Sequence, residues 1–589
     1  MKGAFANRVA ALLAATSTAL GLVIDETWTK PPSRILQWQA TSDAGPIVDL
    51  EYARYQGYYN PTFDLNIFRG VRFAAPPKRW QLPEAPAVNR TALIQATNDP
   101  PRCPQAGSAP TPASVNFETS ILGNEDCLFL NVFSPKNATK LPVVVWIHGG
   151  GYGLGSAPSF DFNYIGQTVD NGFVAVAIQY RLGAFGFLSS AEVAKHGTAN
   201  AGVHDMHFAL QWVQKYISRF GGDPDQVTIT GESAGGGSVM LMAMVNGGTE
   251  GTKLFRRGIS SSPYYPTQPE FNGGMPTDYY LQFARRAGCL GENESPPADG
   301  SLFKCLEKTD TLILQNASAY TSYAAKASQW AFIPVTDGKL IREQPTEQLL
   351  AGKVNGERMV TGSNGNEGRY FVPNNITTAD RFLAFIRLNW PALSPTAITS
   401  VLAAYAFPDN ITATHPKFDS DGLNFPFATS VSGAAVSWQQ AAYNLYAETT
   451  FVCPAYWLAD AYTGRGKKAW RYQVSTPNAF HGVDIGFLTS DPVTTGATGV
   501  AGPEFRRGFQ EIWGRFIVSG DPTLAGTAPG TAAASGAKWR VWGQDGTHDM
   551  LNLNVTQGTT KADWTVVDAL KFEDGRGARC ALWAEVGVR

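Results

Sequence analysis

The stretch Val227-Thr228-Ile229-Thr230-Gly231-Glu232-Ser233-Ala234-Gly235 contains the strongest indication of the fold. Its first four residues read as a strand, and the apolar run that continues to Met244 reads as a helix. The glycines flanking Ser233 predict a strained strand-to-helix turn, because they keep side chains away from it. Such a turn would display the serine hydroxyl at the end of a sheet, with a helix N-terminus beneath it.

Other segments predict an alternation of strands and helices around this turn. Apolar residues recur at helical spacing over 206–220, and Gly221-Gly222-Asp223-Pro224 ends that helix. Five further segments read as strands: 128–133, 143–147, 173–178, 359–362 and 470–474. The alternation predicts an α/β fold with a mainly parallel sheet. The Gly/Ala/Thr/Ser-rich segments 494–502 and 526–536 read as surface loops within the same unit.

Composition indicates a globular chain without a nucleic-acid-binding surface. The 589 residues are 44% hydrophobic and 16% charged, so a large core can form. The formal net charge is -2 and no Lys/Arg run is present, which predicts no nucleic-acid partner.

The first residues read as a secretory signal. Lys2 and Arg8 supply positive charge, and 9–23 is mostly apolar. Small residues that suit cleavage lie near the end of this segment: Ser17, Ala19 and Gly21. We therefore expect a signal peptide over 1–21 and a single secreted catalytic domain over 22–589. No other segment approaches about 20 uninterrupted apolar residues, so no stable membrane anchor is expected.

Sequons and cysteines fit an exported chain. The predicted glycosylation sites are Asn89, Asn137, Asn293, Asn316, Asn375, Asn410 and Asn554. Six cysteines without metal-ligand spacing predict disulfides and no metal site, and the residues alone leave their pairing open.

A glycine run predicts an oxyanion hole. His148-Gly149-Gly150-Gly151 follows the strand 143–147, where backbone N–H groups can approach a substrate closely. The expected donors are Gly150, Gly151 and Ala234, each contributing about 3 to 4 kcal/mol when well aimed. A phosphate loop is disfavoured because no Gly-Lys-Ser/Thr follows.

A serine nucleophile needs a histidine base and an acid that orients it. The order serine, acid, histidine leaves His415, His481 and His548 as candidate bases. His481 is preferred because its glycine-containing loop follows the strand 470–474, whereas the other two read as surface residues.

Two carboxylates compete for the role of the acid. Glu367 lies in a loop after the strand 359–362, and Asp337 lies in another glycine-containing turn. A carboxylate in such a turn is usually a structural cap, so the residues alone leave both open.

The chain resembles the type-B carboxylesterase family, which includes cholinesterases, some fungal lipases and the catalytically silent neuroligins. The motifs that carry the resemblance are 125–131, 148–151, 200–202 with Asp205, 220–224, and 227–236. The resemblance itself extends over nearly the whole mature chain. The resemblance implies an α/β-hydrolase fold, with a large mostly parallel central sheet, helices on both faces and long insertions. It also implies that the triad is Ser233, Glu367 and His481, which decides against Asp337.

The same resemblance implies three disulfides and two supporting contacts. The implied pairs are Cys103 with Cys127, Cys289 with Cys305, and Cys453 with Cys580, each contributing about 2 to 4 kcal/mol. Arg79 and Glu125 match an ion pair that braces the first disulfide loop in relatives. Ser262 matches a serine that forms a hydrogen bond near the triad.

The aromatic residues depart from the cholinesterase pattern. The loop between the first two cysteines lacks the tryptophan that holds a quaternary ammonium, and Phe117 is its largest aromatic residue. Choline specificity is therefore not expected. Four other aromatic residues are candidates either for a substrate pocket or for ordinary core: Tyr152, Tyr264, Tyr265 and Phe371.

These observations predict a secreted carboxylic ester hydrolase that forms an acyl-enzyme on Ser233. We expect no cofactor or metal, and a small-molecule or lipid ester as substrate. A general carboxylesterase is preferred, and a lipase or a feruloyl or tannin esterase is the alternative. A neuroligin-like adhesion module is the alternative from another class, and it would lack a triad residue.

Overall fold

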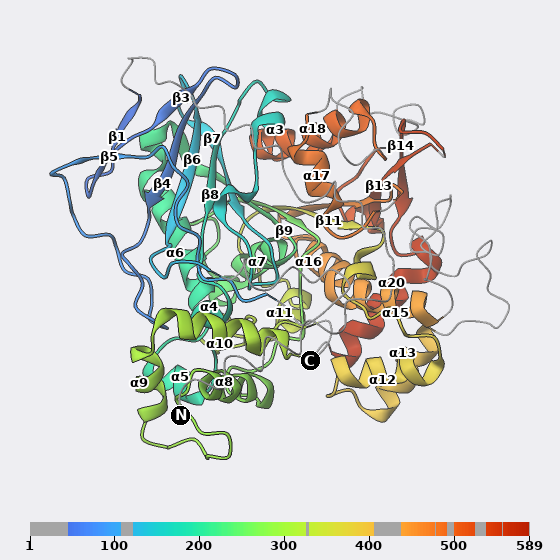
Figure 1. The fold of residues 1–589 in the computed structure, drawn as a ribbon. Coiled ribbons are helices and arrows are strands. Elements are labelled where there is room, and N and C mark those ends of the chain that lie inside the picture. Colours follow the sequence, from blue (N-terminus) through green and yellow to red (C-terminus); the bar gives the residue numbers. More distant parts are fainter. Residues whose placement is uncertain are drawn as a thin grey trace, which may run out of the picture. The chain divides into compact units, whose positions relative to one another are not determined.

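The structure is a computed structural model, shown in Figure 1. It describes residues 45–107, 122–325, 329–405, 438–477, 479–491, 500–524, 538–556 and 558–587. These residues all fall within one compact unit, Gly45–Arg589. Several predicted features lie outside the described residues: the signal segment 1–21, Phe117, Asn410, His415, the loop 526–536 and most of 494–502.

An eleven-stranded mixed sheet forms the centre of the described unit, with the order β14-β13-β12-β11-β10-β9-β7-β8-β6-β4-β3. All pairs from β13 to β8 are parallel, and the strands outside them pair antiparallel. The strands are β3 (Tyr58–Asn60), β4 (Leu65–Arg72), β6 (Phe129–Pro135), β7 (Leu141–Ile147), β8 (Val174–Ile178), β9 (Gly222–Glu232), β10 (Arg257–Ser261), β11 (Arg358–Asn364), β12 (Lys468–Val474), β13 (Asp549–Val555) and β14 (Ala562–Asp568). A small sheet is formed by β1 (Ile47–Asp49), β2 (Arg54–Gln56) and β5 (Leu93–Gln95).

Strand β7 shows why its sequence is continuously apolar. Val143, Val145 and Ile147 pack into one hydrophobic core, whereas Val144 and Trp146 pack into a second core on the opposite face. Side chains alternate between the faces of a strand, so a strand covered on both faces needs apolar residues at every position.

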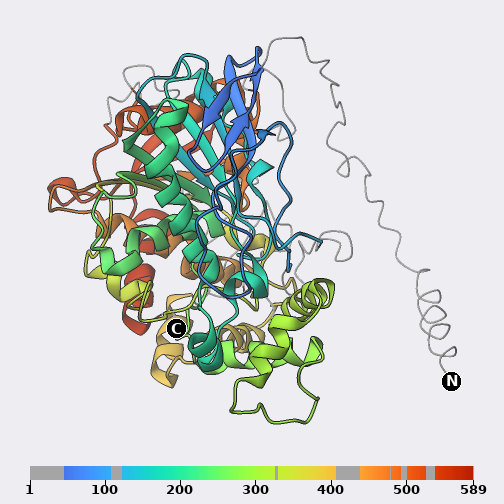
Figure 2. The ribbon, with the colours of Figure 1, turned by 90° about the vertical axis from the view of Figure 1, so that its left-hand side faces the viewer.

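Helices cover both faces of the sheet. One face packs against α3 (Asn163–Gln167), α17 (Val483–Thr489) and α18 (Pro503–Ser519), at the upper right of Figure 1. The other packs against α6 (Ala201–Tyr216), α7 (Ala234–Met244) and α16 (Cys453–Ala461). In the turned view of Figure 2, green helical segments lie against one side of the strands.

The remaining helices lie mainly in the insertions between these elements. They are α4 (Gly183–Phe187), α5 (Ala191–His196), α8 (Gly274–Arg286), α9 (Ser301–Lys308), α10 (Thr311–Tyr323), α11 (Pro345–Leu350), α12 (Ala379–Asn389), α13 (Pro395–Ala404), α15 (Trp438–Ala447) and α20 (Phe572–Val586). Short 3-10 segments are η2 (Ala157–Ser159), η3 (Ile217–Phe220), η4 (Val245–Gly248), η5 (Glu367–Tyr370) and η7 (Gln544–Gly546), and η6 (Glu448–Val452) is a π-helix. Among the described residues, no helix is long and apolar enough to cross a membrane.

The prediction of an α/β fold is confirmed, with different element boundaries. The helix predicted from residue 206 begins at Ala201, and its last turn is the 3-10 segment η3. Gly221 ends it with a φ of 80°. Strand β9 begins directly at Gly222, before the predicted start at Val227, because Gly222 pairs with Leu141 of β7.

Three disulfides and one ion pair link segments that lie apart in the sequence. The disulfides are Cys103–Cys127, Cys289–Cys305 and Cys453–Cys580. Arg79 pairs with Glu125 at 2.7 Å, and its guanidinium also donates to the carbonyl groups of Leu306 and Thr309. The pair therefore connects the first disulfide loop to the last turn of α9 and to the residue that follows it.

The described sequons differ in exposure. Five are exposed: Asn89, Asn137, Asn293, Asn316 and Asn375. Asn554 lies in β13 and is only 4% exposed. A glycan needs an accessible side chain, so occupancy of this sequon stays a prediction that its burial disfavours.

Candidate active site

Ser233 lies at the turn between β9 and α7. Its φ of 61° and ψ of -125° are unusual for a residue with a side chain, and such strain is typical of functional positions. A side chain at Gly235 would collide with the carbonyl oxygen of Ile147, so glycine is required there. Hydrogen bonds hold the turn, because the N–H of Ser233 donates to Ser261 and its carbonyl accepts from Tyr264.

Glu367 follows the carboxyl end of β11 and is fully buried. Its Oε1 accepts from the backbone N–H of Asn364 at 2.5 Å and from the hydroxyl of Ser262 at 2.6 Å. Its Oε2 lies 2.5 Å from Nδ1 of His481. The carboxylate is therefore fixed on one side by β11 and β10 and directed at the imidazole on the other.

His481 follows the carboxyl end of β12, as the sequence predicts. Because Nδ1 contacts Glu367, Nε2 is the ring nitrogen available to a substrate or nucleophile. The ring packs against Phe451 and Phe371, at centroid distances of 4.4 and 5.1 Å. These contacts fix the plane of the imidazole.

A cavity of about 220 Å³ lies over the turn. It is lined by Gly150, Gly151, Glu232, Ser233, Tyr264, Trp330, Phe371 and His481. The cavity thus brings together the predicted nucleophile, the predicted base and two of the three predicted oxyanion donors. The third, Ala234, is the first residue of α7, where the helix N-terminus favours negative charge.

Buried carboxylates surround the imidazole. Burial raises the pKa of Glu232 to about 8, and Oε1 of Glu232 lies 3.3 Å from Nε2 of His481. Burial also raises the pKa of Asp484, which accepts hydrogen bonds from Ser261 and Asn364. Burial of His481 would lower its pKa, but Glu232, Glu367 and Asp484 together raise it to about 9. The site therefore stabilises an imidazolium.

The rival candidates lie in other surroundings. Asp337 accepts hydrogen bonds from the side chain of Asn200 and from the N–H groups of Lys339 and Ile341, as a structural turn carboxylate does. His548 packs on Trp542 near the start of β13, with a centroid distance of 4.9 Å.

Of the four aromatic candidates, two line the cavity and two belong to the hydrophobic core. Tyr264 and Phe371 line the cavity. Tyr152 and Tyr265 are buried core residues, 1% and 2% exposed. Tyr152 packs on Phe187, and the hydroxyl of Tyr265 accepts from Thr346.

Sequence reasoning missed four residues of the site. Trp330 lies against the glycine loop, where a side chain at Gly151 would collide with the indole. Glu232 stands in the stretch around Ser233 and Asp484 follows His481 by three residues, but only the tertiary surroundings reveal their effect on charge. Phe451 precedes Cys453 by two residues, and no local pattern marks its contact with His481.

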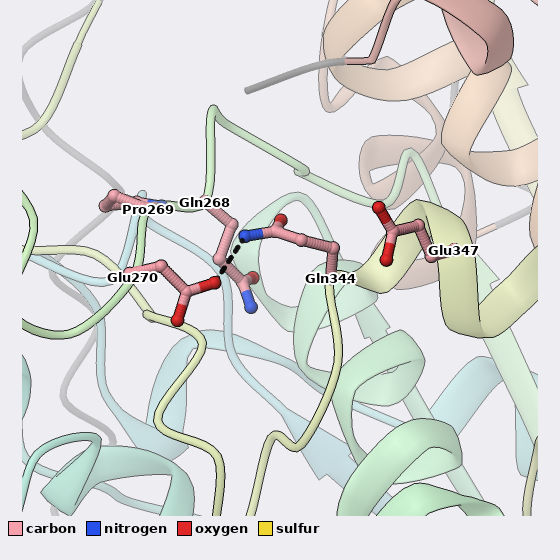
Figure 3. A pocket seen from close by; sticks show the side chains of 5 residues that line it. All are labelled: Gln268, Pro269, Glu270, Gln344 and Glu347. Carbon is pink, nitrogen blue, oxygen red and sulfur yellow. Dashed lines mark hydrogen bonds between the residues drawn. The ribbon is translucent and has the colours of Figure 1, made fainter.

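A second hollow, of about 460 Å³, lies outside this cavity (Figure 3). The described residues that line it are Gln268, Pro269, Glu270, Gln344 and Glu347. Nε2 of Gln344 donates to Glu270 across it at 3.2 Å. These lining residues include no serine, cysteine or histidine, unlike those of the cavity at Ser233.

The fold and the site define a hydrolase of the α/β class, with the nucleophile turn at the carboxyl end of a parallel sheet. A family model described as the carboxylesterase family matches residues 44–567. The chain belongs to this family and is a carboxylic ester hydrolase. The predictions of family, fold class and enzyme class are confirmed.

Individual relatives agree with this assignment. Secreted lipase 4 of Gibberella zeae is 29% identical over 445 residues, covering 75% of this chain and 76% of the lipase. Carboxylesterase 1E of Rattus norvegicus is 28% identical over 522 residues, covering 82% and 87% of the two chains. The crystal structure of EstA from Aspergillus niger superposes with a TM-score of 0.73 at 26% identity, covering 92% of this chain and 98% of EstA.

Proposed function

We propose that this protein is an exported general carboxylesterase that transfers the acyl group of its substrate to Ser233. The observation that carries the proposal is the position of Glu367. It binds Nδ1 of His481, while His481 and Ser233 line the same cavity. A buried carboxylate of this kind holds the imidazole in the tautomer whose Nε2 can accept a proton.

The reaction would proceed in two steps. His481 takes the proton from the hydroxyl of Ser233 as the oxygen attacks the ester carbonyl, and then protonates the departing alcohol. Water next attacks the acyl-enzyme with His481 again as base, which releases the acid and restores the serine. Gly150, Gly151 and Ala234 would donate backbone N–H groups to the oxyanion in both steps.

The experiment that tests this proposal replaces the nucleophile. Ser233→Ala should abolish hydrolysis of p-nitrophenyl butyrate and labelling by a fluorophosphonate, while the circular dichroism spectrum stays that of the wild type. Peptide mass spectrometry should locate the label of the wild-type enzyme on Ser233. A variant that retains near-wild-type turnover, or a label on another residue, would refute the assignment.

Export is a separate part of the proposal. It is supported by the apolar N-terminal segment, by three disulfides and by the similarity to a secreted lipase. Expression of the full chain in a eukaryotic host should deliver protein to the medium with an N-terminus near residue 22. Retention of an intact residue 1 in the secreted protein would refute cleavage over 1–21.

A further inference from the structure

The π-helix η6 places an aromatic ring against the catalytic histidine. It continues α15 into α16, and its five residues are all buried. Phe451, fully buried within it, lies 4.4 Å from the imidazole of His481 with an interplanar angle of 39°. π-helical turns are rare and are often found at functional sites.

Phe451 restrains a part of the imidazole that the carboxylate does not reach. Glu367 binds only the Nδ1 edge, so rotation about that hydrogen bond could still redirect Nε2. Phe451 and Phe371 contact the ring at centroid distances of 4.4 and 5.1 Å, and lie 5.5 Å from each other. Together they limit this rotation and exclude water from that side of the ring.

A buried charge cluster joins η6 to the C-terminal helix α20. Glu448, the first residue of η6, accepts two hydrogen bonds from Arg579, at 2.8 and 2.7 Å. The hydroxyl of Tyr405 donates to it at 2.6 Å, and Nε of Arg576 lies 3.5 Å away. Burial would raise the pKa of Glu448, but the two arginines and the tyrosine lower it overall. The carboxylate is therefore held in its charged form.

Helix α20 also contacts the strand that precedes the histidine. Arg576 donates to the side chain of Gln473 in β12 at 2.6 Å, and His481 follows β12. The disulfide Cys453–Cys580 links the residue directly after η6 to α20. Two arginines and one disulfide thus tie the same helix to η6, which holds Phe451, and to β12, the strand that precedes His481.

We propose that α20 positions His481 for catalysis, through the Glu448–Arg579 pair and the ring of Phe451. Phe451 is a positioning residue, because it touches the imidazole and not the reacting atoms. Buried ion pairs are often no more stabilising than apolar packing, but they fix geometry. Fixed geometry matters here because a displacement of about 1 Å at a catalytic group can lower a rate about 100-fold. The inference rests on the proposed role of His481 as general base.

The test compares two buried phenylalanines. Phe451→Leu should lower kcat for p-nitrophenyl butyrate by about 10- to 100-fold, with KM within about twofold of wild type. Phe283→Leu is the control, since Phe283 is equally buried but lies on α8 against Trp80 and Phe332.

Arg579→Met tests the connection to α20. Like Phe451→Leu, it should lower kcat. The double variant should be little slower than Phe451→Leu alone, because both substitutions act through the same contact with the imidazole. Rates are taken per fluorophosphonate-titrated site, which removes any contribution from unfolded protein. A per-site kcat within twofold of wild type for Phe451→Leu would overturn the proposal, as would strictly additive losses.

Failure of this inference is distinguishable from failure of the proposed function. If Ser233→Ala is inactive and Phe451→Leu is unimpaired, only the positioning role is wrong. If Ser233→Ala retains its activity, the triad itself is wrong, whatever Phe451→Leu does.

Discussion

Oε2 of Glu367 lies 2.5 Å from Nδ1 of His481, and this carboxylate is fully buried. A glutamine at position 367 could present its N–H₂ group to Nδ1 and so favour the tautomer in which Nε2 already bears the proton. Glu367→Gln should therefore lower kcat by about 10³- to 10⁴-fold, as carboxamide replacement does in other serine hydrolase triads. Stopped-flow and steady-state assays with p-nitrophenyl butyrate measure the loss.

Glu347→Gln is the control for this substitution, because Glu347 is an exposed glutamate on α11. It should leave kcat within twofold of wild type. A loss below tenfold in Glu367→Gln would contradict the role of Glu367 as the orienting acid.

The acid limb of the pH profile should lie above pH 6.5. Three carboxylates raise the pKa of His481, so the imidazole stays protonated, and unable to accept a proton, to a higher pH than an ordinary histidine. Activity should therefore rise with pH through the alkaline side of neutrality. Glu232→Gln removes the carboxylate beside Nε2, and this should shift the limb to lower pH.

The measurement is kcat/KM for p-nitrophenyl acetate between about pH 5 and 10. Because Glu232 and His481 lie 3.3 Å apart, the profile reports the pair and not one group. Glu270→Gln, in the hollow of Figure 3, should leave the limb where it is. If the acid limb of Glu232→Gln lies at the same pH as that of the wild type, or at a higher pH, the carboxylate of Glu232 does not raise the pKa of His481.

Trp330 should limit the length of the acyl group. Its indole lines the cavity of about 220 Å³ and lies against the loop at Gly151 and Gly153. Trp330→Ala should enlarge the cavity and raise the ratio of kcat/KM for p-nitrophenyl octanoate over acetate by about tenfold, within the range that pocket contacts supply. The same ratio should be unchanged in Tyr59→Ala, an exposed aromatic of β3. An unchanged ratio in Trp330→Ala would show that the limit lies elsewhere.

Local patterns sufficed for those parts of the site that lie within one motif. The strand-turn-helix around Ser233 and the glycine run at Gly150 and Gly151 are each encoded by neighbouring residues, so both were predictable. The choice of Glu367 over Asp337 needed the family resemblance, because each carboxylate lies in a glycine-containing turn. In the structure the parallel pairing of β11 with β12 brings Glu367 to His481 across 114 positions of sequence.

Contacts between distant insertions could not be predicted in this way. Phe451 and Trp330 enter the site from segments whose local sequence shows ordinary apolar character, and only tertiary packing assigns them a neighbour. The predicted boundaries of the helices and strands were wrong for a similar reason. Strand β9 begins at Gly222 because Leu141 of β7 pairs with it, which is a property of two strands and not of one segment.

A buried ion pair should stabilise the scaffold beneath the site. Asp205 of α6 and Arg181 after β8 form a buried pair, with exposed side-chain fractions of 0% and 4%. Nε of Arg181 donates to Oδ2 at 2.7 Å, and Nη2 donates to Oδ1 at 2.7 Å. Asp205→Ala leaves the guanidinium buried without its counter-charge, so the free energy of unfolding should fall by about 3 to 5 kcal/mol.

Urea unfolding followed by tryptophan fluorescence, with the disulfides kept oxidised, measures this loss as a lower transition midpoint. Asp225→Ala is the matched control, because Asp225 is an exposed aspartate at the start of β9, where substitutions change stability by about 0.5 kcal/mol or less. Asp205→Ala should keep its per-site kcat in dilute buffer, since the pair lies outside the cavity. A midpoint equal to that of Asp225→Ala would mean that the carbonyl oxygens of Lys78 and Gln81, which also accept from Arg181, suffice to hold its charge.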